Sequence, residues 1–250
     1  MFNAADAYDR FMGRYSQLLA PQMAELGRVA PGQHVLDVGC GPGALTSELV
    51  RRLGRCAVCA IDPSESFVEA ARGRNPGVDV KRAAAEQLPF PDAEFDASLA
   101  QLVVHFMSDP AEGLAEMARV TRPGGVVAAC VWDHGGGQGP LSPFWEAACE
   151  LDPSIEDESG LAGARRGHLS ELLGEIGVGD VQETLLSVSV EYGSFDEWWE
   201  PLTHGVGPAG TYLSTLEPEH HARLRERCRE AAPERRLTVT ARAWAARGRT

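Results

Sequence analysis

The sequence predicts an α/β fold, a doubly wound, Rossmann-like sheet with helices on both faces. Apolar segments of strand length alternate with helix-like segments between residues 34 and 132, and a glycine-rich turn follows the first apolar segment. The apolar segments are almost unbroken, which is typical of parallel strands buried between two helical layers. This alternation predicts right-handed strand–helix–strand crossovers.

The predicted core covers residues 31–132. We expect its strands at residues 34–38, 56–61, 78–82, 95–101 and 126–132. We expect its helices at residues 44–53, 64–73 and 111–120. Ser64 is the expected N-cap of the second helix. The segment 122–125 (RPGG) is expected to close the third helix.

Two further regions flank this core. Residues 1–30 are expected to form a helical lid, because Tyr8, Phe11 and Tyr15 recur at helical spacing. Residues 133–250 are expected to complete a seven-stranded sheet and to insert a helical cap. The two added strands are predicted at 181–190 and 237–245, and further helices at 142–151, 165–176, 195–202 and 217–232. The last strand alternates apolar and polar residues, which predicts one antiparallel strand in an otherwise parallel sheet.

The charge balance limits the partners. Lys and Arg number 23 against 36 Asp and Glu, a net charge of −13, so phosphate backbones repel the chain and we expect no nucleic-acid partner. No apolar run has the length of a membrane span, and the start does not resemble a signal peptide, so we expect a cytoplasmic protein. Cys56 and Cys59 lack a second pair at zinc spacing, so no metal site is expected. The oligomeric state is left open.

The strongest local signal is the segment 35–43 (VLDVGCGPG), in which a strand runs into glycines and then a helix. Glycine lets the backbone turn sharply and approach a ligand closely. Asp62 ends the next strand, 23 positions after Gly39. In a doubly wound sheet this acid lies beside the glycine loop, where it can accept hydrogen bonds from both hydroxyls of a ribose.

A dinucleotide site is the competing interpretation. Gly39, Gly41 and Ala44 also satisfy the GxGxx(G/A) fingerprint, so an NAD(P)-dependent oxidoreductase is an alternative. Asp37 argues against it, because a carboxylate near the loop repels a pyrophosphate. The same carboxylate is compatible with a positively charged sulfonium compound.

Four separated stretches resemble the class I S-adenosylmethionine-dependent methyltransferases, in the UbiE-like small-molecule group. They are VLDVGCGPGALT at 35–46, IDPSESFVEAAR at 61–72, AEQLPFPDAEFD at 85–96 and HFMSDPAEGLAEMARVTRPGG at 105–125. A dehydrogenase has no reason to carry the last two. The resemblance implies S-adenosylmethionine as cofactor and a small-molecule acceptor. A non-catalytic protein that binds S-adenosylmethionine is a further alternative.

The resemblance assigns cofactor contacts residue by residue. It implies that Gly39, Cys40, Gly41 and Gly43 pass under the methionine part of the cofactor. It implies that Asp37 steers the loop and the amino group.

The other implied contacts lie at the following strand ends. Asp62 would hold the ribose hydroxyls, and Pro63 would pack near the adenine. Ala85 would give a backbone N–H to an adenine nitrogen, with Glu86 beside it. Gln101 would line the floor below the methyl group.

One position departs from the motif of these relatives. Many relatives have Gly-Asp-Ala-Glu before Leu-Pro-Phe, whereas this chain has three alanines and Glu86, so Ala84 lacks the carboxylate for the adenine amino group. Either Glu86 substitutes for that carboxylate, or stacking and main-chain contacts hold the adenine.

The segment 8–15 resembles a leading helix that folds over the cofactor in some relatives. Its Arg14 would pair with the carboxylate of the donor, or is an ordinary surface arginine.

Transfer to oxygen or nitrogen can require a base. His105 follows the fourth strand and is the catalytic candidate, with His134 and His204 as alternatives. Aromatic side chains in the cap indicate an apolar or aromatic acceptor. They also have a simpler explanation as packing between cap and sheet. Methylation on oxygen, nitrogen or carbon is left open.

Overall fold

The computed structural model describes residues 8–205, 207–231 and 236–250. Within them a seven-stranded sheet has the order β3-β2-β1-β4-β5-β7-β6. The strands are β1 (Val35–Val38), β2 (Val58–Asp62), β3 (Asp79–Arg82), β4 (Phe95–Gln101), β5 (Thr121–Trp132), β6 (Gly179–Tyr192) and β7 (Leu237–Arg249). β7 runs antiparallel to both β5 and β6, and the other pairings are parallel. The predicted doubly wound sheet with one antiparallel strand is confirmed.

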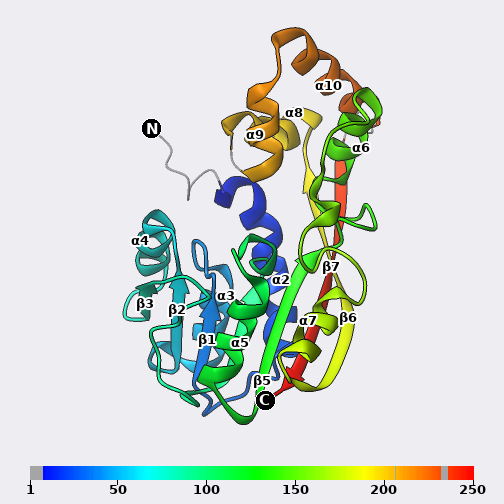
Figure 1. Cartoon of the computed structure of the whole chain (residues 1–250). Coiled ribbons are helices and arrows are strands. Elements are labelled where there is room, and N and C mark those ends of the chain that lie inside the picture. The colour runs from blue at the N-terminus through cyan, green and yellow to red at the C-terminus, as the bar shows by residue number, and fades with distance from the viewer. Residues whose placement is uncertain (1–7, 206, 232–235) are drawn as a thin grey trace.

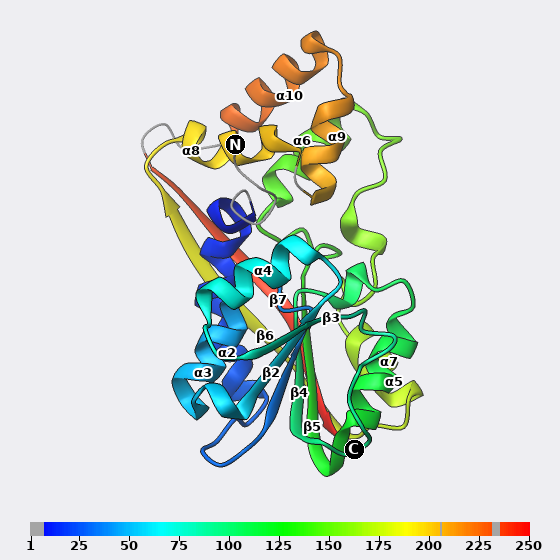
Figure 2. The same ribbon diagram turned by 90° about the vertical axis from the view of Figure 1, so that its left-hand side faces the viewer.

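Helices cover both faces of the sheet (Figure 2). One face packs against α2 (Arg14–Leu26), α3 (Ala44–Leu53) and α4 (Glu65–Arg74), and the other against α5 (Pro110–Val120) and α7 (His168–Glu175). Neighbouring residues of β1 serve both layers, because Val35 belongs to the first cluster and Leu36 to the second. This explains why Val35, Leu36 and Val38 are apolar, whereas Asp37 is the one charged residue of the strand.

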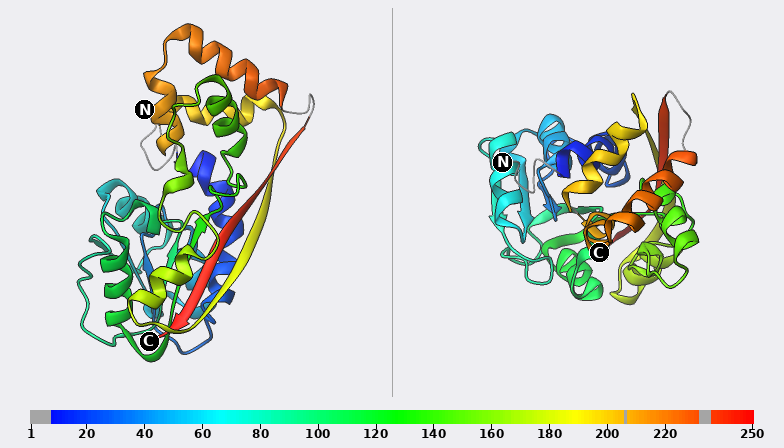
Figure 3. Two further views of the ribbon diagram at one scale, coloured as in Figure 1. Left: turned by 45° about the vertical axis from the view of Figure 1, so that its right-hand side comes forward. Right: turned by 90° about the horizontal axis from the view of Figure 1, so that it is seen from above.

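A helical cap stands beyond the carboxyl ends of the parallel strands (Figures 1 and 3). It consists of α6 (Ser142–Leu151), α8 (Phe195–Trp199), α9 (Gly207–Thr215) and α10 (Pro218–Glu230). The long strands β6 and β7 reach up to it, paired from Gly179↔Arg249 to Tyr192↔Leu237. The buried Phe144 and Trp198 belong to the same hydrophobic cluster as the first sheet face, so the cap shares the core.

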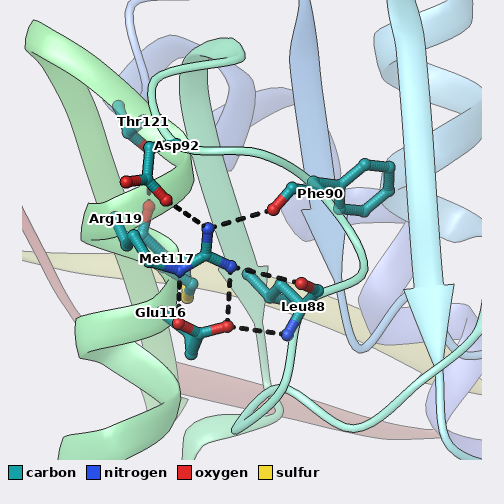
Figure 4. A network of polar contacts seen from close by, with 7 residues as sticks. All are labelled: Leu88, Phe90, Asp92, Glu116, Met117, Arg119 and Thr121. Carbon is teal, nitrogen blue, oxygen red and sulfur yellow. Dashed lines mark hydrogen bonds and ion pairs between the residues drawn. The ribbon is translucent and has the colours of Figure 1, made fainter.

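The segment between β3 and β4 is fixed to α5 by one arginine (Figure 4). Arg119 donates to the carbonyls of Leu88 and Phe90 at 3.2 and 3.0 Å and to Asp92 at 2.6 Å. It also holds Glu116, whose Oε2 accepts the backbone N–H of Leu88 at 2.9 Å. Because the guanidinium has five fixed donors, it can satisfy several carbonyls of an irregular segment at once.

Several predicted boundaries were wrong. A helix, α9, was not predicted, and β5 begins at Thr121 because the RPGG segment continues the strand instead of only closing α5. Ser64 has the N-cap position, but its hydroxyl lies 3.0 Å from that of Ser66 and caps no backbone N–H of α4.

The N-terminal helix is shorter than predicted. A π-helical turn at Asp9–Gly13 leads into α2, which ends at Leu26. Residues 1–7 of the expected lid lie outside the described residues. Among the helices that the structure describes, none combines the length and the apolar character that crossing a bilayer requires.

Candidate functional site

A cavity opens at the carboxyl ends of β1, β2 and β4, beside the glycine loop. We call it the donor cavity. Its lining includes six residues that the sequence assigned to the cofactor, namely Asp37, Gly39, Cys40, Gly41, Asp62 and Gln101. The strand order places these ends next to one another, because β1 pairs with both β2 and β4. This is the edge at which ligands bind in open α/β sheets.

The glycine loop has a backbone that only glycine adopts easily. Gly39 has φ +69°, and a Cβ there would collide with the side chain of Val103. Gly41 has φ +52°, and a Cβ there would project into open space. The backbone N–H of Cys40 donates to the carbonyl of Ile61 at 2.8 Å, which ties the loop to β2. The loop therefore presents bare backbone to the donor cavity.

Asp62 braces this loop. Its Oδ2 accepts the N–H of Gly41 and its Oδ1 accepts the N–H of Ser64, both at 2.9 Å. Burial raises the pKa of Asp62, while the two backbone hydrogen bonds oppose that shift. Each carboxylate oxygen has a further lone pair available. The carboxylate is thus fixed at the cavity wall and can still accept from a pair of hydroxyls.

Three buried polar atoms of the lining have no hydrogen-bond partner among the described residues. They are Oδ1 of Asp37, Oε1 of Gln101 and the hydroxyl of Ser16. Asp37 accepts the hydroxyl of Thr46 at 2.6 Å through its other oxygen, and burial raises the pKa of Asp37 to about 7. Unsatisfied buried acceptors are costly, so they suit a ligand that brings hydrogen-bond donors, such as an amino group.

The other expected cofactor contacts do not line the donor cavity. Gly43 forms the left-handed N-cap of α3, and Pro63 is exposed. Ala85 is buried in the core, and Oε1 of Glu86 accepts the N–H groups of Ser108 and Asp109 at 2.7 and 3.2 Å. Glu86 is therefore engaged in holding the segment before α5.

Arg14 also lies away from the cavity. Its guanidinium donates to Glu197 and to the carbonyl of Glu191, both at 2.6 Å, and stands 4.3 Å from the ring centre of Tyr192. Arg14 thus fastens α2 to β6 and α8. The expected pairing of Arg14 with the carboxylate of a donor stays a prediction.

The sequence did not single out several lining residues. Tyr8 and Asp9 enter from the N-terminal turn, where Tyr8 packs on Phe67 at 5.5 Å between ring centres and Asp9 is paired with Arg74. Burial raises the pKa of Tyr8 to about 12. Phe106 follows β4 and is 59% exposed. The helical spacing of apolar residues indicated Tyr8 only as an apolar position. No local sequence pattern indicated that Phe67 or Phe106 lines a site.

A second cavity adjoins the first. We call it the histidine cavity. It shares Tyr8, Leu102 and Phe106 with the donor cavity. Its other lining residues are Phe11, Met12, His105, Trp132, His134, Pro140, Leu141, Glu158, Gly207 and Pro208. An apolar enclosure with few polar groups is typical of a small-molecule site.

Two of the three candidate histidines meet here. The rings of His105 and His134 lie 6.0 Å apart, and burial lowers the pKa of His105 to about 3 and that of His134 to about 4. Both imidazoles are therefore neutral near pH 7. Nδ1 of His105 and Nε2 of His134 have no partner within the described ranges. His204 lines neither cavity and pairs with Glu200 at 2.7 Å on the surface.

No group of three or more metal-ligating side chains occurs in the part of the chain that the structure describes. Cys56 is exposed and Cys59 is buried, and both are free thiols. Nε2 of His34 lies 3.5 Å from Sγ of Cys59, which makes a pair and not a set of three ligands.

Comparison with known proteins adds independent information. Residues 36–129 match a family model described as a methyltransferase domain. A malonyl-[acyl-carrier protein] O-methyltransferase of Serratia marcescens is 37% identical over 129 residues, which are 49% of this chain and 50% of that protein. A demethylmenaquinone methyltransferase of Renibacterium salmoninarum is 38% identical over 104 residues, 42% of this chain and 43% of that protein. The chain thus spans about half the length of the curated relatives it matches.

The fold likeness extends further than the sequence likeness. The crystal structure of a putative methyltransferase from Bacillus halodurans superposes with a TM-score of 0.57 over 92% of this chain and 97% of that one, at 17% identity. This likeness shows that the chain shares the fold of that protein. Residues 36–129 are thus similar to a methyltransferase domain, and the curated relatives of this part of the chain include an O-methyltransferase and a demethylmenaquinone methyltransferase.

Proposed function

We propose that this chain moves the methyl group of S-adenosylmethionine to a small acceptor held in the histidine cavity. One observation carries the proposal, namely that the donor and histidine cavities adjoin and share Tyr8, Leu102 and Phe106. Two ligands side by side are what a group transfer needs, because alignment of the reacting atoms supplies much of the rate.

The residues present fit the donor. Asp62 would hold the ribose hydroxyls, and the bare backbone of Gly39 and Gly41 would lie under the methionine part. Asp37 and Gln101 would accept from its amino group with their unpartnered oxygens. When bound, S-adenosylmethionine supplies an electrophilic methyl on a good leaving group. The chain then has to orient the acceptor, exclude water and accept a proton.

His105 is the catalytic residue of this proposal. It lies just beyond β4, and its neighbours Leu102, Val103 and Phe106 line the donor cavity. Its neutral imidazole has an unpartnered Nδ1 that can accept a hydrogen bond from the reacting group. As the new bond to carbon forms, the attacking atom becomes positively charged and its proton strongly acidic. A buried imidazole of low pKa can therefore take that proton.

The alternatives are less well supported. A buried Asp37 with an unpartnered oxygen disfavours the pyrophosphate of a nicotinamide dinucleotide. A protein that only binds S-adenosylmethionine has no need of a second cavity with two histidines. The acidic balance of the chain favours a small molecule over a nucleic acid. Its six free cysteines suit a reducing compartment, so we place it in the cytoplasm.

The test is a pair of measurements on the wild-type protein. S-adenosylhomocysteine should raise its melting temperature, whereas nicotinamide dinucleotides should not. Labelled methyl should then pass from S-adenosylmethionine to members of a panel of phenols, quinols, amines and small acids. Binding without transfer to any acceptor would favour the non-catalytic alternative, and stabilisation by a dinucleotide alone would contradict the proposal.

A further inference from the structure

The histidine cavity has a second polar wall, built by the segment that follows β5. Nε1 of Trp145 donates to Oε2 of Glu158 at 2.7 Å, and the same oxygen lies 3.9 Å from Nδ1 of His134. Glu158 is only 5% exposed. A buried carboxylate held by a tryptophan behind a histidine has no evident packing purpose, because an apolar side chain would fill the space at lower cost.

Glu158 determines what His134 presents to the cavity. At 3.9 Å the two atoms are too far apart for a direct hydrogen bond, so Glu158 acts through its negative charge. The negative charges of Asp157 and Asp133 oppose the effect of burial on the pKa of His134. The charge of Glu158 favours the tautomer with its proton on Nδ1. Nε2, which has no partner among the described residues, is then a hydrogen-bond acceptor within the cavity wall.

The charges of the lining restrict the acceptor. No lysine or arginine is among the described residues that line the histidine cavity. A carboxylate acceptor would meet Glu158 with no counter-charge, which is costly in an apolar enclosure. A protonated amine would pair with Glu158 but would have no lone pair for the methyl group. An uncharged acceptor fits both conditions.

The unpartnered atoms add a geometric requirement. With the protons on Nε2 of His105 and Nδ1 of His134, the unpartnered Nδ1 of His105 and Nε2 of His134 are both acceptors, and the unpartnered Nε1 of the lining residue Trp132 is a donor. One hydroxyl has a single hydrogen, so it cannot serve both imidazoles. Two hydroxyls on neighbouring ring carbons supply one hydrogen for each imidazole, and the ring centres of His105 and His134 are 6.0 Å apart. A hydroxyl oxygen also has a lone pair left for the indole N–H.

From this arrangement, and resting on the proposed function, we propose that the acceptor is an uncharged aromatic molecule with two adjacent hydroxyls. His105 contacts the hydroxyl that is methylated, and His134 accepts the hydrogen bond of its neighbour. Glu158 is a positioning residue that acts through His134. In the transfer the oxygen–carbon bond forms as the carbon–sulfur bond breaks, the electron pair stays on sulfur, and the proton of that hydroxyl goes to Nδ1 of His105.

The test compares a naphthalenediol with adjacent hydroxyls against naphthol, naphthoate and naphthylamine as methyl acceptors. Wild type should prefer the diol over naphthol by about 10²-fold in kcat/KM, mostly through KM. In Glu158→Gln this preference should fall to a few-fold, because the amide still accepts from Trp145 but carries no charge. Glu156→Gln is the matched control, since Glu156 is exposed two residues away. His134→Phe should lose the preference in the same way.

A second readout does not depend on turnover. Calorimetry on the protein saturated with S-adenosylhomocysteine should show the diol binding wild type and the Glu156→Gln control more tightly than His134→Phe. A wild type that favours naphthol, naphthoate or naphthylamine, or a Glu158→Gln variant that matches its control, would overturn the inference. If neither S-adenosylhomocysteine binding nor transfer to any acceptor occurs, the proposed function itself fails.

Discussion

The hydroxyl of Tyr192 donates a hydrogen bond of 2.9 Å to the hydroxyl of Tyr15, and both side chains are buried. Tyr15 lies in α2, directly after the turn that supplies Tyr8 and Asp9 to the donor cavity. Tyr192 ends β6, the strand that reaches the cap. Together with Arg14, this pair connects the N-terminal segment that lines the donor cavity to the strand that reaches the cap.

Tyr192→Phe should therefore destabilise the protein, because it leaves the buried hydroxyl of Tyr15 without its donor. We expect a loss of about 1–2 kcal/mol in the free energy of unfolding. Tyr15→Phe with Tyr192→Phe should recover part of this loss, since neither hydroxyl is then left unpaired. Denaturant unfolding of the two single variants and the double variant measures the coupling. Strictly additive losses would show that the hydroxyl pair contributes nothing to the junction.

Asp37 is expected to lower the stability of the free protein at neutral pH. Its pKa is raised from the ordinary 3.8 to about 7, so the fold favours the neutral form. The stability linked to that form is complete below pH 3.8 and is lost as the pH rises through about 7. Asp37→Asn should raise the free energy of unfolding at pH 8 by roughly 1–4 kcal/mol and change little at pH 4.

The same Asp37→Asn variant should bind S-adenosylhomocysteine more weakly, which would show that a functional carboxylate is kept at a cost in stability. Thermal melts at both pH values, with exposed Asp79→Asn as control, make the comparison. A variant less stable than wild type at pH 8 would contradict the role given to burial.

Arg119 should contribute to stability through the carbonyls it satisfies. Arg119→Leu leaves the Leu88 and Phe90 carbonyls without their donor, and we expect a loss of about 2 kcal/mol. Arg119 also lowers the pKa of Glu116, so this pair stabilises the fold above pH 4.5 and loses its effect as the pH falls below that value. The variant should thus lose part of the acid sensitivity of wild type.

Denaturant titrations at pH 7 and pH 3 measure both effects of Arg119→Leu. Arg122→Leu is the comparison, because Arg122 makes a surface ion pair with Asp96 and is itself 60% exposed. Such pairs contribute little, about 0–1 kcal/mol. If both variants lost the same free energy of unfolding, the hydrogen-bond network of Arg119 would not be what stabilises this segment.

His105→Ala should slow methyl transfer without weakening the donor site. We expect kcat to fall about 10²-fold if a proton must be removed from the acceptor. Affinity for S-adenosylhomocysteine should be unchanged, because His105 lines the histidine cavity only. His204→Ala, at an exposed histidine, should behave as wild type. Unaltered turnover in His105→Ala would remove it from the mechanism.

The parts of the fold that were predictable are those in which neighbouring residues decide the structure. The limits of α3 and β4 follow from apolar runs bounded by glycine or charged residues, and the sequence located them to the residue. The strand ends then bring Asp37, Asp62 and Gln101 together, because the sheet order forces them to one edge.

The features that the sequence could not show depend on contacts distant in the chain. Arg14 is directed by Glu197, which is 183 positions away, and nothing near Arg14 indicates that partner. Glu158 is buried in the wall of the histidine cavity, where Trp145 donates a hydrogen bond to it, although its own segment is polar and rich in turn residues. Ala85 and Glu86 matched the family motif locally, yet α5 and the residues before it engage them.

The most direct test of the account is the affinity for S-adenosylmethionine, measured by calorimetry in wild type and Asp62→Ala. If the Asp62 carboxylate holds the ribose while bracing Gly41, its removal should weaken binding by about 2 kcal/mol. Asp79→Ala, on the exposed start of β3, should bind as wild type does. An Asp62→Ala protein that stays folded and binds S-adenosylmethionine with wild-type affinity would contradict the site described.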